Sequence, residues 1–288
     1  MHAIDERKLL VGLIGAGIQQ SLSPAMHEEE ARFHGMRLHY QRIDLDREGA
    51  GAAALPSLLA AARIMGFAGL NITYPCKQTV IPLLDELSDE ARAIGAVNTV
   101  VCNDGKLIGH NTDGSGWRWG FQRAMPNADL TRVLLLGAGG AGAAIAHAAL
   151  RLGVRQLIVV DQERQRAADL VKKLVEKYGP RAEANVAVAS ALRGASGLIH
   201  ATPTGMNKMP GMPLAAELLR SDLWVAEVVY FPLETQLLKA ARDHGCATLD
   251  GGGMAVGQAV GAFELFTGVA PDAARMEAHL RRLLAAKS

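Results

Sequence analysis

Apolar residues form short runs along the chain, separated by longer stretches with helical spacing. Glycine or polar residues bound most of the runs, which predict strands at 9–14, 37–45, 67–72, 97–101, 106–109, 132–136, 156–160, 198–201 and 224–229. Helical spacing predicts a helix that starts at Ser23-Pro24, with Ser23 as its N-cap, and others at 50–65, 113–125, 143–152 and 251–287. Asn103-Asp104-Gly105, between two of the runs, predicts a hairpin.

The pattern of predicted strands and helices changes near residues 113–114. Beyond this point, nearly continuous apolar strands alternate with helices, which is typical of a parallel sheet covered on both faces. Before it, strands and polar loops follow one another less regularly. We therefore expect an α/β protein in which an N-terminal α/β domain precedes a doubly wound, Rossmann-type domain with a parallel sheet.

Composition and charge exclude some classes of function. The 288 residues carry a formal net charge of +1 without a basic stripe or acidic tail, so neither nucleic acid nor an anionic membrane is the expected partner. Three widely separated cysteines and the spacing of the histidines predict neither a disulfide framework nor a metal site. We read no signal peptide and no transmembrane span, and we expect a cytoplasmic protein.

A glycine-rich turn gives the clearest chemical signal. Gly137-Ala138-Gly139-Gly140-Ala141-Gly142 satisfies the GxGxxG pattern between a strand and an alanine-rich helix. The first glycine makes the turn, the second admits a dinucleotide pyrophosphate, and the third lets the helix pack on the strand; the helix N-terminus faces the phosphates. Gly15-Ala16-Gly17 also follows a strand, but Gln20 takes the place of the third glycine. We interpret it as a turn into a functional loop.

An acidic residue ends the next strand. Asp161 lies 19 residues beyond Gly142, where a carboxylate can accept hydrogen bonds from the adenosine ribose and repel the 2′-phosphate of NADP. A solvated acid at a strand end is the simpler alternative. Arg166 could bind that phosphate, although stacking on adenine suits it better beside Asp161. NAD is therefore the expected cofactor.

Polar motifs gather at predicted strand ends in the first half. They are Ser21-Leu22-Ser23-Pro24, Asn71-Ile72-Thr73-Tyr74-Pro75-Cys76-Lys77, Gly95-Ala96-Val97-Asn98-Thr99-Val100 and Asn111-Thr112-Asp113-Gly114. Hydroxyl, amide and charged groups at such positions are typical of ligand contacts, here a pocket for a polyhydroxylated molecule.

Together with the glycine turn, these motifs resemble the shikimate/quinate dehydrogenase family. The resemblance runs almost the whole length and includes His200-Ala201-Thr202-Pro203-Thr204-Gly205-Met206, Tyr230-Phe231-Pro232-Leu233-Glu234-Thr235 and Gly252-Gly253-Met254. It implies NAD-linked interconversion of shikimate and 3-dehydroshikimate, of quinate and 3-dehydroquinate, or of both. It also implies a substrate domain of residues 1–112 and 250–288, to which the C-terminal helix returns, and an NAD-binding domain of residues 113–249. The oligomeric state stays open between monomer and homodimer.

The resemblance also implies roles for single residues. Lys77 and Asp113 match the catalytic pair. The substrate would be bound by Ser21 and Ser23 at its carboxylate, by Thr73, Asn98 and Gln258 at its ring hydroxyls, and by Tyr230 near the carboxylate. Besides the glycine turn, Asp161 and Arg166, the residues bordering the cofactor would be Thr202, Gly205, Met206, Val228, Gly251 and Met254.

The two residues of the implied catalytic pair have opposite effects on the protonation of Lys77. Oxidation of an alcohol needs a base, and Lys77 becomes one only after losing its own proton, whereas an adjacent Asp113 carboxylate stabilises the ammonium. We therefore treat the pair as one coupled unit and leave the proton acceptor open. A surface lysine and an N-cap aspartate are the structural alternatives.

Three positions depart from the family's usual pattern. Gln20 stands where many members have His, His200 where Asn is common, and Glu227 where Asp is usual. These departures leave open a paralogue acting on a related cyclic hydroxy acid such as aminoshikimate, or a non-catalytic NAD- or metabolite-sensing protein. NADP-using members carry an Asn-Arg-Thr type cluster after the second cofactor strand, where this chain has Asp161-Gln162-Glu163. Asp161 with Arg166 five residues on resembles the NAD-using quinate/shikimate branch instead.

Overall fold

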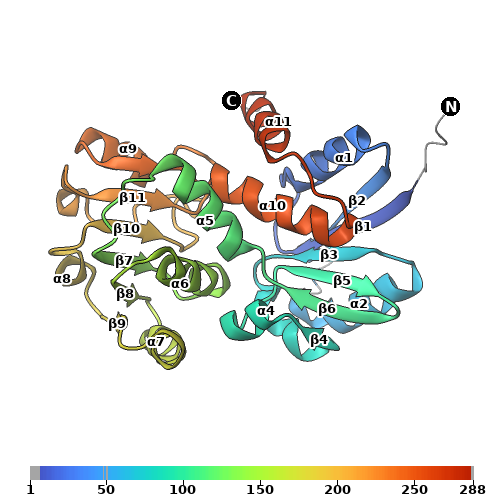
Figure 1. Cartoon of the computed structure of the whole chain (residues 1–288), viewed down its shortest axis with the longest axis horizontal. Coiled ribbons are helices and arrows are strands. Elements are labelled where there is room, and N and C mark those ends of the chain that lie inside the picture. Colours follow the sequence, from blue (N-terminus) through green and yellow to red (C-terminus); the bar gives the residue numbers. More distant parts are fainter. Residues whose placement is uncertain (1–6, 48, 50, 287–288) are drawn as a thin grey trace. The chain divides into compact units, whose positions relative to one another are not determined.

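Each half of the chain is built around a six-stranded sheet. The computed structural model describes residues 7–47, 49 and 51–286, and the chain divides into one unit of residues 1–112 and 256–288 and a second unit of residues 113–255 (Figure 1). Residues 250–255, which the sequence analysis assigned to the first unit, belong to the second. Their backbone packs there, since a Cβ on Gly251 would lie 2.5 Å from the carbonyl oxygen of Val228.

The sheet of the first unit is mixed. Its strands are β1 (Lys8–Gly15), β2 (Arg37–Asp44), β3 (Gly69–Ile72), β4 (Glu86–Leu87), β5 (Thr99–Asn103) and β6 (Lys106–His110), in the order β2-β1-β3-β5-β6-β4. β1 is parallel to β2 and β3, while β3, β5 and β6 pair antiparallel. The predicted hairpin is confirmed between β5 and β6, where Asp104 and Gly105 both have positive φ, as a tight primed turn requires.

Helices cover both faces of this sheet. Its helices are α1 (Ser23–Phe33), α2 (Leu55–Ile64), α3 (Cys76–Thr79), α4 (Asp89–Ile94) and α11 (Ala273–Ala285), and α10 (Gly252–Thr267) begins in the second unit and ends in the first. Successive strand residues point to opposite faces. Ile14 packs in one cluster with Leu55 and Leu59 of α2, whereas Leu13 packs in another with Phe266 of α10.

Several predicted helix boundaries were wrong. Leu22, not Ser23, is the N-cap of α1, and the Ser23 hydroxyl instead lies 3.3 Å from that of Ser21. The helix predicted at 251–287 is two helices, because Gly268 adopts a φ of 69° after α10. The helix predicted from residue 50 begins at Leu55 after a 3₁₀ turn, and residue 50 itself lies outside the described residues.

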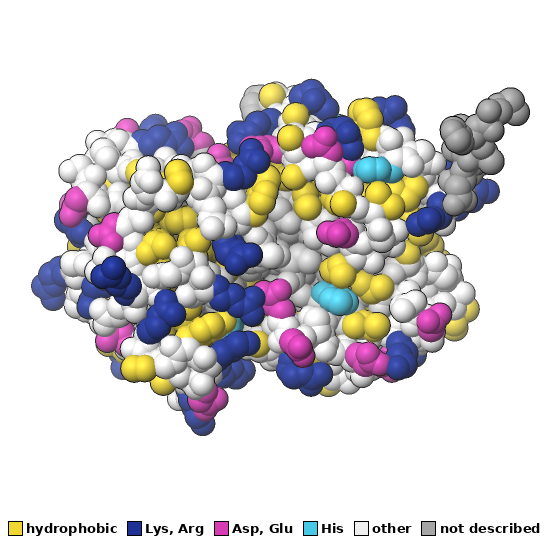
Figure 2. Space-filling model, in the orientation of Figure 1, with side chains coloured by type: hydrophobic (Ala, Val, Ile, Leu, Met, Phe, Trp, Pro, Cys, Tyr) yellow, Lys and Arg dark blue, Asp and Glu magenta, His cyan; other side chains and the backbone are white. Residues whose placement is uncertain are grey.

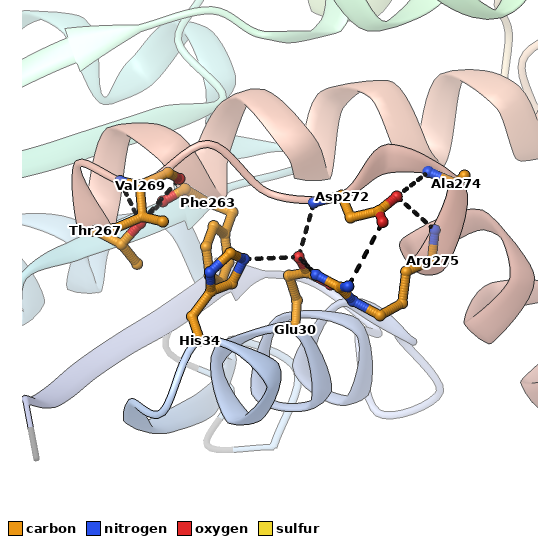
Figure 3. A network of polar contacts seen from close by, with 8 residues as sticks. All are labelled: Glu30, His34, Phe263, Thr267, Val269, Asp272, Ala274 and Arg275. Atoms are coloured by element: carbon orange, nitrogen blue, oxygen red, sulfur yellow. Dashed lines mark hydrogen bonds and ion pairs between the residues drawn. The ribbon is translucent and has the colours of Figure 1, made fainter. Parts of the chain in front are cut away.

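A buried carboxylate ties α1 to the start of α11 (Figure 3). The Glu30 side chain is only 1% exposed and accepts hydrogen bonds from Arg275 Nη2 (2.6 Å), Arg275 Nε (2.7 Å) and the Asp272 backbone N–H (2.8 Å). Burial opposes ionisation of Glu30, but the bonds from Arg275, Asp272 and His34 outweigh it and lower its pKa. The C-terminal helix is thereby held within the first unit.

The second sheet has a Rossmann order. Its strands are β7 (Arg132–Leu136), β8 (Gln156–Val160), β9 (Ala182–Ala184), β10 (Gly197–His200), β11 (Trp224–Glu227) and β12 (Ala247–Leu249), all parallel in the order β12-β11-β10-β7-β8-β9. The chain leaves β7 for β8 on one side and later resumes at β10 on the other. The strand order therefore reverses between β7 and β10, where such folds bind dinucleotides.

The remaining helices belong to this second unit. They are α5 (Asp113–Ala124), α6 (Gly140–Leu152), α7 (Arg164–Tyr178), α8 (Val188–Leu192) and α9 (Gln236–Asp243). α6 begins at Gly140, earlier than the predicted Ala143, so its first turn is part of the glycine motif. Basic and acidic side chains are interspersed over the face of the chain in Figure 2. Across the described residues, no helix combines the length and apolar character needed to cross a membrane.

Candidate active site

The glycine turn lies between β7 and α6, where the strand order reverses. Gly137 has a φ of 102°, and a Cβ there would lie 2.7 Å from the Ala201 carbonyl oxygen. A Cβ on Gly142 would lie 2.0 Å from the Gly137 carbonyl oxygen, whereas a Cβ on Gly139 would meet no atom within 4 Å. The protein's own packing thus requires glycine at 137 and 142, while the space at Gly139 stays open for a ligand. The first N–H groups of α6 have no partner within the helix and suit an anion there.

Asp161 is attached to this turn from the tip of β8. Its Oδ2 accepts a hydrogen bond from the Ala138 N–H (2.7 Å), and its Oδ1 accepts one from the Glu163 N–H (2.8 Å). Arg166 Nη1 lies 3.3 Å from the same carboxylate, and Arg166 also pairs with Glu163. The Asp161 side chain is 8% exposed. The acid is therefore fixed beside the glycine turn, and the guanidinium is drawn to two carboxylates.

Two loops follow the neighbouring strands β10 and β11. After β10, Thr202 Oγ1 lies 2.5 Å from His200 Nε2, and Gly205, with a φ of 94°, donates its N–H to the Met209 carbonyl (2.7 Å). After β11, the Val228 N–H donates to Glu227 (2.8 Å), and half-buried Tyr230 follows. Met206 is 42% exposed and Met254 is buried in the first turn of α10. The second unit thus carries the whole expected cofactor set, and Tyr230 of the expected substrate set.

A residue that sequence reasoning missed holds the serine loop of the first unit, residues 15–23. Asp44, the last residue of β2, accepts hydrogen bonds from the N–H groups of Gly17 (2.9 Å) and Ile18 (3.1 Å) and from Gln19 Nε2 (2.9 Å). Burial opposes its ionisation, but these bonds and one from the Asp46 N–H lower its pKa. The sequence placed Asp44 inside a strand. Its position one residue from the end of the predicted run was the only available signal.

A buried amide connects two predicted substrate residues. Asn98 is 3% exposed; its Nδ2 donates to Thr112 Oγ1 (2.9 Å) and its Oδ1 accepts the Thr112 N–H (2.8 Å). The Thr112 hydroxyl in turn donates to the Gln258 carbonyl (3.0 Å). Asn98 and Gln258 therefore lie in one network with Thr112, which the sequence analysis had quoted in a motif without a role.

The predicted catalytic residues occupy the starts of two helices. Lys77 is the second residue of α3, is half-buried, and accepts the Val97 N–H at its carbonyl (2.8 Å). Thr73, just after β3, donates its N–H to the Ile14 carbonyl (2.9 Å). Asp113 is 4% exposed and is the first residue of α5, directly after Thr112. Among the residues that the structure describes, no group of three or more His, Cys, Asp or Glu side chains could hold a metal ion.

Known proteins resemble the chain over nearly its full length. Family models for the shikimate dehydrogenase substrate binding domain and the shikimate 5′-dehydrogenase C-terminal domain match residues 13–100 and 251–281. A shikimate dehydrogenase (NADP+) of Streptomyces avermitilis is 57% identical over 95% of each chain. A quinate/shikimate dehydrogenase (NAD+) of Corynebacterium glutamicum is 47% identical over 93% of this chain and 96% of that protein. The solved quinate dehydrogenase of Corynebacterium glutamicum in complex with NAD superimposes with a TM-score of 0.88 at 45% identity, covering 96% and 99% of the two chains.

Proposed function

The chain belongs to the shikimate dehydrogenase family of oxidoreductases, which use a nicotinamide cofactor, and we propose that its own reaction is the NAD-linked oxidation and reduction of shikimate, quinate or both at C3. The observation that carries the proposal is the Asp161 carboxylate bonded to the glycine turn. It places a negative charge where the adenosine ribose of a dinucleotide binds in this fold.

The relatives differ in the cofactor that their names give. The Streptomyces protein is named for NADP and the Corynebacterium proteins for NAD, so identity alone does not choose. The local charge supports NAD: Asp161 would accept hydrogen bonds from a ribose 2′-hydroxyl and would repel a 2′-phosphate. Arg166, the nearby cation, already faces Asp161 and Glu163 and so offers that phosphate little net attraction.

The substrate would be held mainly by the first unit. Ser21 and Ser23, whose hydroxyls lie 3.3 Å apart, form a pair of donors suited to a carboxylate. Thr73, Asn98 and Gln258 would contact ring hydroxyls, and Tyr230 of the second unit would lie near the carboxylate. Asp44 positions the serine loop without needing to touch the substrate.

Lys77 and Asp113 would manage the hydroxyl proton. Bound NAD would supply the hydride acceptor for alcohol oxidation. Lys77, half-buried at the start of α3, would hydrogen-bond the C3 oxygen, and buried Asp113 would share the proton with it. We assign the proton to the pair as a unit and do not divide it between the two groups.

An activity matrix tests this function. Purified protein is assayed with shikimate, quinate and aminoshikimate, each against NAD and NADP. We expect turnover of shikimate or quinate with preference for NAD; no turnover of either, with NAD binding intact, would refute the substrate assignment. Lys77→Ala should abolish turnover while NAD still binds, whereas Lys172→Ala, which removes an exposed lysine of α7, should change neither.

A further inference from the structure

A histidine and a glutamate are buried side by side at the carboxyl ends of β10 and β11. His200 and Glu227 are register partners in the parallel pair, and they are 0% and 1% exposed. His200 Nδ1 lies 2.9 Å from Glu227 Oε1 and 3.0 Å from Oε2. Because a carboxylate can only accept, Nδ1 carries the proton and donates it. These are two of the positions at which this chain departs from the family's usual residues.

The pair is the centre of a network that reaches into both following loops. On one side, His200 Nε2 lies 2.5 Å from Thr202 Oγ1, which accepts the Thr204 N–H (3.3 Å). On the other side, Glu227 accepts the N–H groups of Val228 (2.8 Å) and Val229 (3.1 Å). It also accepts the hydroxyl of Thr235 (3.0 Å), the N-cap of α9. One buried carboxylate therefore fixes the start of the loop after β11 and, through the imidazole, the loop after β10.

These loops lie on one side of the point where the strand order reverses. The glycine turn follows β7 and Asp161 follows β8, so the adenosine half of a dinucleotide belongs over β7 and β8. A dinucleotide spans the reversal point, and its other half therefore belongs over β10 and β11. The loop after β10 also lies against the glycine turn, where a Cβ on Gly137 would be 2.7 Å from the Ala201 carbonyl oxygen. The bonds from Glu227 to the loop after β11 therefore carry the effect of the network on the nicotinamide side.

We propose that His200 and Glu227 are positioning residues that set the two loops, residues 201–206 and 228–230, against the nicotinamide half of the cofactor. Neither residue needs to touch the ligand. Glutamate is required because it satisfies the imidazole, two backbone N–H groups and a hydroxyl at once, which a single amide oxygen does less well. This inference rests on NAD as the cofactor of the proposed function.

Binding of NAD and of ADP-ribose, which lacks nicotinamide, tests the proposal by titration calorimetry. Glu227→Gln keeps the shape of the side chain and should weaken NAD binding by about tenfold or more while changing ADP-ribose affinity less than about threefold, since Glu227 bonds the loop after β11 directly and the loop beside the glycine turn only through His200. Ser196→Ala is the matched control, because Ser196 precedes β10 at its opposite end and bonds the Asp129 and Arg132 carbonyls. It should affect stability without changing the ratio of the two affinities.

Two substitutions at position 200 separate positioning from general damage to the fold. His200→Asn keeps a donor in the place of Nδ1, since both nitrogens are bonded to Cγ, and should weaken NAD binding less than about threefold, whereas His200→Ala leaves Glu227 without that donor and should weaken it by about tenfold. Equal losses for both ligands, unchanged NAD affinity in Glu227→Gln, or equal losses in His200→Asn and His200→Ala would overturn the proposal. Neither titration contains substrate. Absence of turnover on shikimate and quinate would therefore refute the proposed function, while the NAD and ADP-ribose affinities would still test the role of His200 and Glu227.

Discussion

Asp161→Asn is the most direct test of cofactor choice in this chain. The substitution keeps the size of the side chain and removes its negative charge beside the glycine turn. An asparagine oxygen can still accept the Ala138 N–H, which Asp161 accepts at 2.7 Å, so the turn should keep its geometry, while the Glu163 N–H outside the turn loses its acceptor. What changes is the electrostatic energy of a phosphate bound at the adjoining ribose.

The size of the effect follows from charge and distance. Two unit charges about 4 Å apart repel by roughly 4 kcal/mol at an effective dielectric near 20, which is close to a thousandfold in affinity. That dielectric suits Asp161, whose side chain is 8% exposed. Arg166 lies 3.3 Å from the carboxylate and cancels part of its field. We therefore expect the ratio of kcat/KM for NAD to that for NADP to fall by about 100-fold.

Initial rates with both cofactors measure this ratio at fixed substrate and ionic strength. The KM for NAD should also rise, since the amide accepts fewer hydrogen bonds from the ribose hydroxyls than the carboxylate does. Asp169→Asn, which removes an exposed charge from α7, is the control and should leave the ratio within about twofold. A ratio in Asp161→Asn equal to that of the unaltered protein would refute the electrostatic argument, and other contacts would then have to determine the cofactor preference.

Three further predictions concern the glycine turn, the core of the first unit and the C-terminal helix of that unit. Gly142→Ala should lower the free energy of unfolding by about 1–3 kcal/mol in thermal or urea denaturation, because its Cβ would lie 2.0 Å from a backbone oxygen. Gly139→Ala should keep stability within about 1 kcal/mol yet weaken NAD binding. Normal NAD binding in Gly139→Ala would contradict the assigned pyrophosphate position. Burial lowers the pKa of His27 to about 4, below the 6.5 of an unfolded chain, so this residue's contribution to stability should be lost as pH falls, by about 2 kcal/mol between pH 7.5 and 5. Urea denaturation at both pH values should show that the difference in free energy of unfolding between the unaltered protein and His27→Gln changes by that amount. A difference that is the same at both pH values would disprove the prediction. Arg275→Ala leaves the buried Glu30 carboxylate without its guanidinium and should lower the free energy of unfolding by about 3 kcal/mol. Arg281→Ala, which removes an exposed ion pair of the same helix, should lower it by less than about 1 kcal/mol. Similar losses from the two variants would contradict the role given to Arg275 in Figure 3.

The second unit was more predictable from sequence than the first. Strands 132–136 and 156–160 coincide with β7 and β8, because a parallel strand buried on both faces is a continuous apolar run with polar ends. The glycine turn was predictable for a different reason: at Gly137 and Gly142 a Cβ would lie under 3 Å from a backbone oxygen, so no residue with a side chain fits there without a shift of the backbone. In both cases the requirement is local, so the sequence carries it.

Features set by tertiary contacts escaped prediction. β4 and β9 are too short to produce a periodic signal. The N-cap of α1 is Leu22, which makes no side-chain capping bond, and the Ser23 hydroxyl lies beside that of Ser21. The anchoring of the serine loop by Asp44 depends on β1 and β2 lying side by side, with Gly15 opposite Asp44. Nothing in the linear sequence reports which strand will be the neighbour.

The placement of Lys77 and Asp113 can be traced to the segment between β3 and β5. The Lys77 carbonyl accepts the N–H of Val97, and the next residue, Asn98, holds Thr112 through both atoms of its amide. Asp113 is joined to Thr112 by a peptide bond. Each member of the proposed catalytic pair is therefore connected by one step to residues 97–98, although the two begin different helices of different units. The buried amide of Asn98 bonds both the backbone N–H and the hydroxyl of Thr112 and so fixes the residue that precedes Asp113, while the adjacent Val97 N–H fixes the backbone of Lys77.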